Sequence, residues 1–414
     1  MVKRSPTALA ESATAPLRLL RAAEAVARLG SAAQAATELH LSSSAVSRAV
    51  QQAEALLGLP LFERGARGMA CTPAGQTLIL RVRRARSELD RAAGPNLAAR
   101  ATDALLHTLV AIAETRSESA AGQRLGVTQS AVHQNLRALE HAARARLFQR
   151  SQRGTRLTEL GERVLLRAKL ALAELRTGHA ELAVFRGLGG VATGRVAVGA
   201  LPMAADVLVP QALSRLFALQ RGVRATVADG TYEALLHQLR HGDLDLVVGP
   251  LRGAQAGVDI LEELLFVDHL VPVVRSGHPL LTGGRLGRPR QLRTLMPWPW
   301  IGPLPGTPAR AAFERAFENA GLAVPPVDLQ VNSPAVVRSV LMAGDSVALL
   351  SALQIRGEVS SGLLTLLPVP LQGTERPIGL MLRRDGLASP ALQTLLAELR
   401  TVAAQAMGQP TVES

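Results

Sequence analysis

A gap-free internal repeat constrains the fold of this chain more than any other feature of its sequence. Residues 41–75 and 127–161 can be superimposed at a constant offset of 86 positions, with no insertion in either copy. The octapeptides LFERGARG (61–68) and LFQRSQRG (147–154) are the clearest part of the match. Because a solenoid needs three or more repeats, two copies at so long an offset predict a duplicated small domain.

Each copy is expected to form three helices followed by a β-hairpin. In the first copy, residues 17–30 carry apolar side chains at helical spacing and end at Gly30, a candidate C-cap. Ser31 can cap a second helix, and a third helix is expected to begin after Ser42. Residues 61–72 then predict a wing around a glycine-containing turn. The pattern is typical of a winged helix-turn-helix, which presents side chains to base edges.

The third helix has two unlike faces. Its apolar residues Val46, Val50, Ala53 and Leu57 share one face, and small or polar residues remain on the other. Small residues let the backbone approach a groove, and Arg and Gln can donate to bases or phosphates. The candidate DNA-contacting residues of the first copy are Ser42, Ser43, Ser44, Ser47, Arg48, Gln51, Arg64 and Arg67. Those of the second copy are Thr128, Gln129, Ser130, His133, Gln134, Arg137, Arg150 and Arg153.

The positive charge is concentrated in the half of the chain that contains the repeat. Residues 1–190 carry 27 Lys and Arg against 15 Asp and Glu, whereas residues 191–414 carry 19 against 18. A codon bias explains why nearly all the basic residues are arginine, but it does not explain their position. The asymmetry favours a half that binds a polyanion joined to a nearly neutral half.

The stretch LSSSAVSRAVQQAEALLGLPLFERGARGMACTPAG (41–75) resembles the winged helix-turn-helix of LysR-type transcriptional regulators. The resemblance rests on Ala-Val-Ser-Arg (45–48), Gly-x-Pro-Leu-Phe-Glu-Arg (58–64) and Thr-Pro-x-Gly (72–75). The second copy is similar but has His133-Gln134 in place of Ser-Arg. Family members ordinarily carry one such domain, so a tandem pair is a departure. We hypothesise that the first copy reads sequence and that the second, with more arginine near its wing, mainly grips phosphates.

The resemblance also predicts how the modules are connected. In the family, the helix after the wing pairs two subunits, so the helix at 158–187 is expected to form a homodimer or homotetramer. The expected layout is a disordered tail (1–15), the first winged domain with its following helix (16–93), a linker (94–101), and the second winged domain with its pairing helix (102–187).

From residue 195 the periodicity changes to alternating strands and helices, which predicts mostly parallel sheets with both faces covered. Gly-Asp-x-Asp-Leu (242–246) and Ser-Gly-His-Pro-Leu (276–280) resemble the effector-binding domain of the same family, a fold shared with type 2 periplasmic binding proteins. PWPWIGPLPGTP (297–308) and RPIGLMLRR (376–384) resemble the subgroup named for a regulator of a galactose-binding protein. The expected domain covers 193–405, with lobe I at 193–267 and 374–405 and lobe II at 268–373. The fold class is thus α+β multi-domain: two tandem winged domains followed by a two-lobed α/β domain.

A cleft between two such lobes is the expected place for a small ligand, at the carboxyl ends of the strands. Several candidates lie at predicted helix N-termini, where backbone N–H groups favour an anion. The alternative is that these residues are simply N-caps. A carboxylate or a sugar would suit the site. The candidate effector-binding residues are Leu201, Pro202, Met203, Thr231, Pro250, Thr307, Asn332 and Ser333.

Other functions find little support in the sequence. It contains no Gly-x-Ser-x-Gly, Walker A or His-Glu-x-x-His motif, so we expect no catalytic residues, cofactor or metal. The single cysteine and the lack of a signal-peptide or membrane-length apolar run predict a cytoplasmic protein without membrane contact. The expected partners are double-stranded DNA, a small-molecule effector and further copies of the chain, with RNA polymerase as a further candidate. A scaffold whose winged domains no longer bind DNA remains the alternative.

Overall fold

The computed structural model describes residues 14–65, 68–151, 154–186, 194–282 and 291–408 of the chain. The predicted tail therefore lies outside the described residues, except for Thr14 and Ala15. The chain divides into two compact units that meet in sequence at Arg195 and Val196, and each unit is described by itself.

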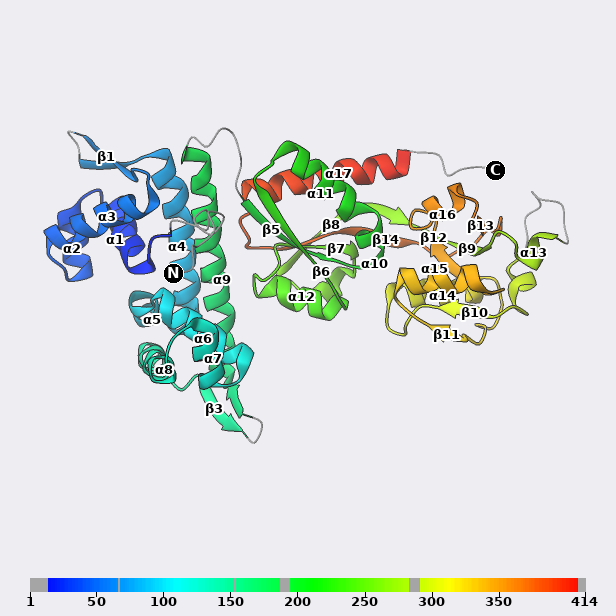
Figure 1. Cartoon of the computed structure of the whole chain (residues 1–414), viewed down its shortest axis with the longest axis horizontal. Helices are drawn as coiled ribbons and strands as arrows, with labels where there is room; N and C mark the ends of the chain where they lie inside the picture. Colours follow the sequence, from blue (N-terminus) through cyan, green and yellow to red (C-terminus); the bar gives the residue numbers. More distant parts are fainter. Residues whose placement is uncertain (1–13, 66–67, 152–153, 187–193, 283–290, 409–414) are drawn as a thin grey trace, which may run out of the picture. The chain divides into compact units, whose positions relative to one another are not determined.

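The first unit contains two winged modules with the same order of elements (Figure 1). The first module comprises α1 (Leu17–Leu29), α2 (Ala32–Leu39), α3 (Ser43–Leu57), β1 (Phe62–Gly65), β2 (Gly68–Cys71) and α4 (Pro73–Ala93). The second comprises α6 (Asp103–Thr115), α7 (Glu118–Leu125), α8 (Gln129–Ala143), β3 (Phe148–Ser151), β4 (Gly154–Leu157) and α9 (Glu159–Glu181), followed by the 3-10 helix η2 (Leu182–Arg186). Each element of the second module begins 86 residues after its counterpart, so the predicted duplication extends to the structure.

The predicted helix ends of the first module are confirmed by their capping geometry. Gly30 adopts a left-handed conformation with φ of 72°, and its N–H donates to the carbonyl of Val26. The hydroxyls of Ser31 and Ser42 each accept a bond from a backbone N–H in the first turn of α2 and α3. These local signals explain why the helix boundaries could be read from the sequence.

A glutamate holds each wing against the third helix of its module. Glu54 Oε1 accepts hydrogen bonds from the N–H groups of Leu61 and Phe62, at 2.8 and 3.1 Å. At the equivalent position, Glu140 Oε1 accepts a 2.8 Å bond from the N–H of Leu147. Because these N–H groups lie at the start of the hairpin and would otherwise need partners, the carboxylate fixes where the strand leaves the core.

The predicted linker at 94–101 forms a short packed helix, α5 (Pro95–Arg100). Leu97 is fully buried, and α5 contacts both α4 and α8. The side-chain amide of Asn96 donates a 2.6 Å hydrogen bond to the carbonyl of Ala142 in α8. The two modules are therefore joined by a short, well-packed element.

Helices α4 and α9 pack along their length as an antiparallel pair. Their buried seams use the same heptad positions in the two copies: Leu78, Val82, Ala85, Leu89 and Ala92 in α4, and Val164, Ala168, Ala171, Leu175 and Gly178 in α9. Arg81 of α4 lies against Glu174 of α9, and the later Glu88 of α4 lies against the earlier Arg167 of α9, so the helices run in opposite directions. Within the chain, α4 covers the apolar seam of α9. The pairing of two subunits through residues 158–187 stays a prediction.

The start of α1 is tied to α9 through a buried histidine. His179 Nδ1 donates to the carbonyl of Leu175 at 2.6 Å, and its Nε2 accepts from the N–H of Ala15 at 3.1 Å. The bond from Ala15 requires the neutral ring, since a protonated ring carries a hydrogen on Nε2 and could not accept there. Burial lowers the pKa of His179 below its usual value, and this effect outweighs the hydrogen bond to Leu175, which raises it.

This arrangement predicts a pH-dependent stability for the first unit. Below about pH 6.5 the unfolded chain gains a proton at His179 that the folded chain does not, so the free energy of unfolding should fall. The fall should end once the pH drops below the lowered pKa of the folded state. Hydrogen exchange of α1 and α9 amides between pH 5 and 7.5, corrected for intrinsic rates, would measure it. H179M should flatten the profile, whereas H141N at an exposed position should not; equal profiles in the wild type and H179M would contradict the prediction.

The second unit contains two five-stranded sheets. The first, which builds lobe I, has the order β6-β5-β7-β14-β8, and the second, which builds lobe II, has the order β11-β10-β12-β9-β13. Strands β5 and β7 are parallel, whereas β14 is antiparallel to β7 and β8. The bounds are β5 (Gly194–Ala200), β6 (Val223–Asp229), β7 (Leu246–Pro250), β8 (Ile260–Asp268), β9 (Leu270–Arg275), β10 (Trp300–Gly302), β11 (Leu329–Gln330), β12 (Val347–Ser351), β13 (Leu364–Leu366) and β14 (Arg376–Arg383).

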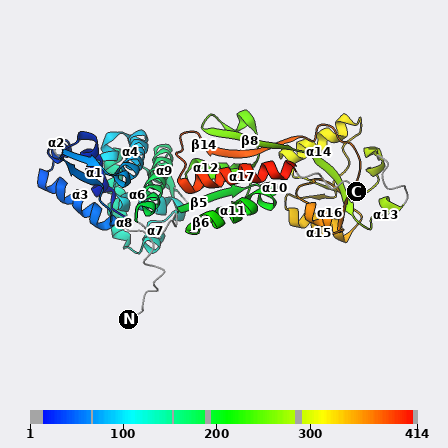
Figure 2. The same cartoon turned by 90° about the horizontal axis from the view of Figure 1, so that it is seen from above.

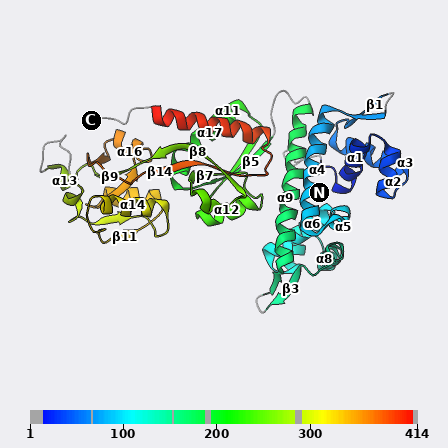
Figure 3. The same cartoon turned by 180° about the vertical axis from the view of Figure 1, so that it is seen from behind.

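Helices cover these sheets and bring loop ends to the space between the lobes. In lobe I, α11 and α17 lie side by side on one face of the sheet and α12 lies on the other (Figure 3). The helices are α10 (Pro202–Asp206), α11 (Leu208–Leu219), α12 (Tyr232–Arg240), α13 (Pro279–Thr282), α14 (Pro308–Asn319), α15 (Pro334–Ala343), α16 (Arg356–Ser360) and α17 (Pro390–Gly408), with 3-10 turns η3 (Gly253–Ala256) and η4 (Leu292–Leu295). This arrangement confirms the predicted fold class.

Candidate nucleic-acid interface and ligand cavity

Helix α3 presents the polar face that the sequence predicts. Val46, Val50, Ala53 and Leu57 are buried, while the predicted DNA-contacting side chains of α3 lie on the opposite face. Of these, Ser47 is half-buried, and the following are exposed: Ser42, Ser43, Ser44, Arg48 and Gln51. Arg48 Nε donates to the carbonyl of Ser44 at 3.3 Å, which leaves most of its guanidinium donors directed to solvent.

Helix α8 presents an equivalent face with different chemistry. All six candidates, Thr128, Gln129, Ser130, His133, Gln134 and Arg137, are exposed. Here the side chains are linked: His133 Nδ1 lies 3.1 Å from Glu118 of α7, and Arg137 Nε donates to His133 Nε2 at 3.0 Å. The chain therefore carries two recognition-type helices whose surfaces are related in position but not in composition.

The predicted basic residues of the wings are only partly within the described structure. Arg64 lies on β1 opposite Met69, and Arg150 lies on β3 opposite Thr155. Arg67 and Arg153 lie outside the described residues. Their role in DNA binding stays a prediction.

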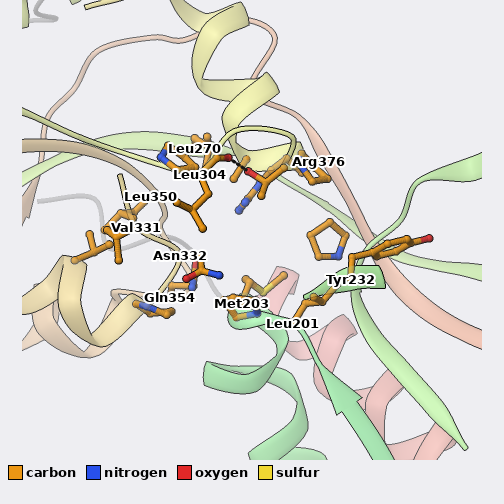
Figure 4. Close-up of a pocket in the computed structure, with 18 of the residues that line it drawn as sticks. Leu201, Met203, Tyr232, Leu270, Leu304, Val331, Asn332, Leu350, Gln354 and Arg376 are labelled. Carbon is orange, nitrogen blue, oxygen red and sulfur yellow. Dashed lines mark hydrogen bonds between the residues drawn. The ribbon is translucent and has the colours of Figure 1, made fainter. Parts of the chain in front are cut away.

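A cavity of about 430 Å³ lies between the two sheets of the second unit (Figure 4). Its volume falls within the range of small-molecule sites. Seven of the eight predicted effector-binding residues line it: Leu201, Pro202, Met203, Thr231, Pro250, Thr307 and Asn332. They come from segments far apart in sequence, which the ends of strands and starts of helices bring together. Ser333 does not line the cavity, so this part of the prediction is not met by the structure.

The hydroxyl groups at the cavity also serve their helices. Thr231 Oγ1 accepts from the N–H of Ala234 at 3.2 Å, and Thr307 Oγ1 accepts from the N–H of Arg310 at 3.1 Å. These residues therefore cap helices and also line the cavity, and their role in ligand binding stays a prediction. Ser333 makes no side-chain cap bond.

The charged residues of the cavity were not predicted from the sequence. The cavity wall includes Arg252 and Arg376 from lobe I and Arg338 from lobe II, against one lining carboxylate, Glu233. The signal for Arg376 was present in RPIGLMLRR, since an arginine opening a buried strand needs a partner or a ligand. What the sequence lacked was any indication that β14 begins at the cavity.

The three arginines differ in how far their charge is already satisfied. Arg338 lies 3.4 Å from Asp206 and 3.2 Å from Glu358. Arg252 pairs with Glu233 at 3.1 Å, and its guanidinium carbon lies 3.9 Å from the centre of the Tyr232 ring, a cation–π contact. The Nε of Arg252 has no hydrogen-bond partner among the described residues.

Arg376 is the most buried of the three arginines, at 6% exposed, and its guanidinium pairs with buried Asp268. Its Nε has no hydrogen-bond partner among the described residues. Buried donors of this kind normally have one.

Two other classes of site are absent from the described part of the chain. No group of three or more His, Cys, Asp and Glu side chains there is placed to hold a metal ion. No helix in the same residues is both long enough and apolar enough to cross a membrane.

Comparison with known proteins assigns both halves of the chain. The family described as "Bacterial regulatory helix-turn-helix protein, lysR family" matches twice, at residues 17–76 and 104–162. The family described as "LysR substrate binding domain" matches residues 189–404. Since both winged regions match a DNA-binding family, the alternative of a scaffold without DNA binding is not supported.

Individual relatives agree with this assignment. The HTH-type transcriptional regulator GalR of Pseudomonas putida is 35% identical over 373 residues, which cover 88% of this chain and 91% of that protein. That span is longer than residues 102–405, so the similarity includes part of the first winged domain. The HTH-type transcriptional regulator PcaQ of Agrobacterium fabrum is 31% identical over 300 residues, 72% of this chain and 94% of that protein.

Solved structures show the same fold. A full-length OxyR variant from Pseudomonas aeruginosa matches with a TM-score of 0.52 at 19% identity, covering 73% of this chain and 96% of that one. CbnR, a LysR family transcriptional regulator, matches with a TM-score of 0.50 at 19% identity, covering 72% and 98%. Together with the family matches over both winged regions and the α/β unit, these findings show that the chain belongs to the LysR family of DNA-binding transcriptional regulators, with a separate effector-binding domain.

Proposed function

We propose that this regulator alters transcription when a small carboxylate with an apolar body occupies the cavity between its lobes. The observation that carries the proposal is the buried Arg376, whose Nε has no partner among the described residues. A carboxylate is the natural acceptor for an arginine fork. Leucine, valine and methionine side chains form much of the remaining wall, which suits an apolar body better than a sugar.

The proposed DNA contacts are the exposed polar residues of α3 and α8, together with the wing arginines Arg64, Arg67, Arg150 and Arg153. Assembly of several chains, contact with RNA polymerase and action in the cytoplasm belong to the same proposal. The relatives named above are transcriptional regulators, and no catalytic role is proposed for any residue.

Ligand binding can be tested on the full-length protein with a panel of aliphatic and aromatic carboxylates, their neutral amides and simple sugars. We expect at least one carboxylate to raise the melting temperature while its amide does not, because only the carboxylate carries the negative charge that pairs with Arg376. R376K keeps the charge beside Asp268 but loses the planar fork, so affinity for that carboxylate should fall about tenfold or more. A response to sugars with none to carboxylates would contradict the proposal.

A pair of cap variants separates ligand binding from helix capping. Thr231 lines the cavity, whereas Ser389 caps α17 through the N–H of Leu392 at 3.2 Å and does not line it. T231A and S389A should each lose about 0.5–2 kcal/mol of stability. Only T231A should also weaken the ligand identified in the panel. Equal ligand affinity in the two variants would show that Thr231 acts only as a cap.

A further inference from the structure

The two winged modules are related by a local two-fold axis, and the evidence is a pair of matching ion pairs. Arg81 of α4 lies 2.8 Å from Glu174 of α9. The residues 86 positions away from these two are Arg167 and Glu88, and they form an ion pair at 2.6 Å. When a contact and its image under exchange of the two copies are both present, the interface is isologous, as in a symmetric dimer.

A second contact marks the position of this axis. The N–H of Leu17 donates to Asp103 Oδ2 at 2.8 Å. These residues open α1 and α6 and occupy the same position in their respective copies. Two equivalent positions can touch only near the axis that exchanges them, so the axis passes between the starts of α1 and α6.

The symmetry places both recognition-type helices on one side of the helix pair. Figures 1 and 2 show α3 and α8 on the same side of α4 and α9. The exposed polar faces of α3 and α8 are therefore exchanged by the same axis. The short helix α5 packs against α4 and α8, which keeps the second module close to the first and favours pairing within the chain over pairing between chains.

We propose that a single chain reads both halves of an inverted pair of DNA half-sites, and that the two half-sites differ in sequence. The inference rests on the proposed function, because it requires α3 and α8 to enter DNA grooves. It replaces the hypothesis that the second copy mainly grips the backbone. Inverted DNA half-sites are related by a two-fold axis. A protein surface with the same symmetry can therefore place one module on each half-site.

The expected difference between the half-sites follows from the equivalent positions of the two helices. Arg48 of α3 corresponds to Gln134 of α8, and Gln51 corresponds to Arg137. Arginine pairs best with guanine and glutamine with adenine. The order of these two side chains is therefore reversed between the modules, and a symmetric palindrome would fit at most one of them.

The test begins by selecting duplexes from a randomised library with the full-length protein at moderate salt. We expect an inverted motif with unequal halves. Titration of a short duplex that carries one motif should then saturate at one duplex per chain, whether or not chains associate through other surfaces. A symmetric motif that saturates at one duplex per two chains would overturn the inference while leaving DNA binding intact.

Two matched variants assign the halves. R48A should relax base preference in one half only and Q134A in the other, each by roughly 5- to 150-fold at the position read. Loss of preference in both halves with R48A, and none with Q134A, would show that two first modules from different chains read the site. Absence of any enriched motif and of salt-dependent binding would overturn the proposed function and this inference with it.

Discussion

R81M is expected to destabilise the first unit by about 3–5 kcal/mol, because it removes the buried guanidinium that pairs with the largely buried Glu181. Glu174, the second partner of Arg81, keeps its ion pair with Arg84 at 2.8 Å. The Arg81 side chain is 3% exposed and donates from Nε to Glu181 at 3.0 Å and from a terminal nitrogen to Glu174 at 2.8 Å. Burial alone would lower the pKa of Arg81, but its hydrogen bonds to Glu181 and Glu174 outweigh burial and hold the pKa above its usual value. Native-state hydrogen exchange of α4 and α9 amides in the full chain would measure the loss.

The internal symmetry supplies a matched control for this prediction. Arg167 occupies the equivalent position in α9 and pairs with Glu88, but its side chain is 34% exposed. R167M should therefore lower the free energy of unfolding of the first unit by only about 0–1 kcal/mol. Replacing Arg81, Glu174 and Glu181 together by methionine should recover much of the loss, since no buried charge then lacks a partner. Equal losses in R81M and R167M would contradict the argument from burial.

G75A and G161A should each disrupt the module that contains the substituted glycine. A Cβ at Gly75 would lie 2.1 Å from the carbonyl oxygen of Leu61, and a Cβ at Gly161 would lie 2.1 Å from that of Leu147. Neither carbonyl can move easily. The N–H of Leu61 is held by Glu54, and its carbonyl accepts a 3.0 Å bond from the N–H of Thr72. We expect each variant to lower the free energy of unfolding by about 3 kcal/mol or more, which is at the upper end of the usual cost of overpacking.

Thermal unfolding of the full-length protein, followed by far-UV circular dichroism, would measure this effect. For a unit of this size, about 3 kcal/mol corresponds to a fall of roughly 6–12 °C in melting temperature. G65A is the control, because a Cβ at Gly65 would meet no atom within 4 Å and the expected change is within about 0.5 kcal/mol. A normal melting temperature in G75A would show that the backbone around Leu61 can relax.

Much of the fold could be predicted because its signals are local. Gly30, Ser31 and Ser42 mark helix ends through bonds to residues two to four positions away. The apolar face of α3 follows from a period of 3.6 residues, so the exposed Arg48 and Gln51 follow as well.

The cavity was predictable in part for a related reason. Thr231 and Thr307 stand where a helix begins after a strand, and such positions converge in α/β sheets. Arg376 was missed because its neighbour Asp268 lies 108 residues away along the chain. No period or cap signal connects residues at that separation.

The sequence alone determined the duplication, the helix ends, the recognition faces and the family. Only the tertiary structure decided which helix pairs with which. The heptad seam of α9 shows that this helix needs an apolar partner, but the same pattern fits a second chain or α4 of its own chain. The choice depends on contacts such as Arg81 with Glu174 and Leu17 with Asp103, and on a connection through α5 short enough to favour pairing within the chain. Those contacts join residues far apart in the sequence, and local sequence patterns do not reveal them.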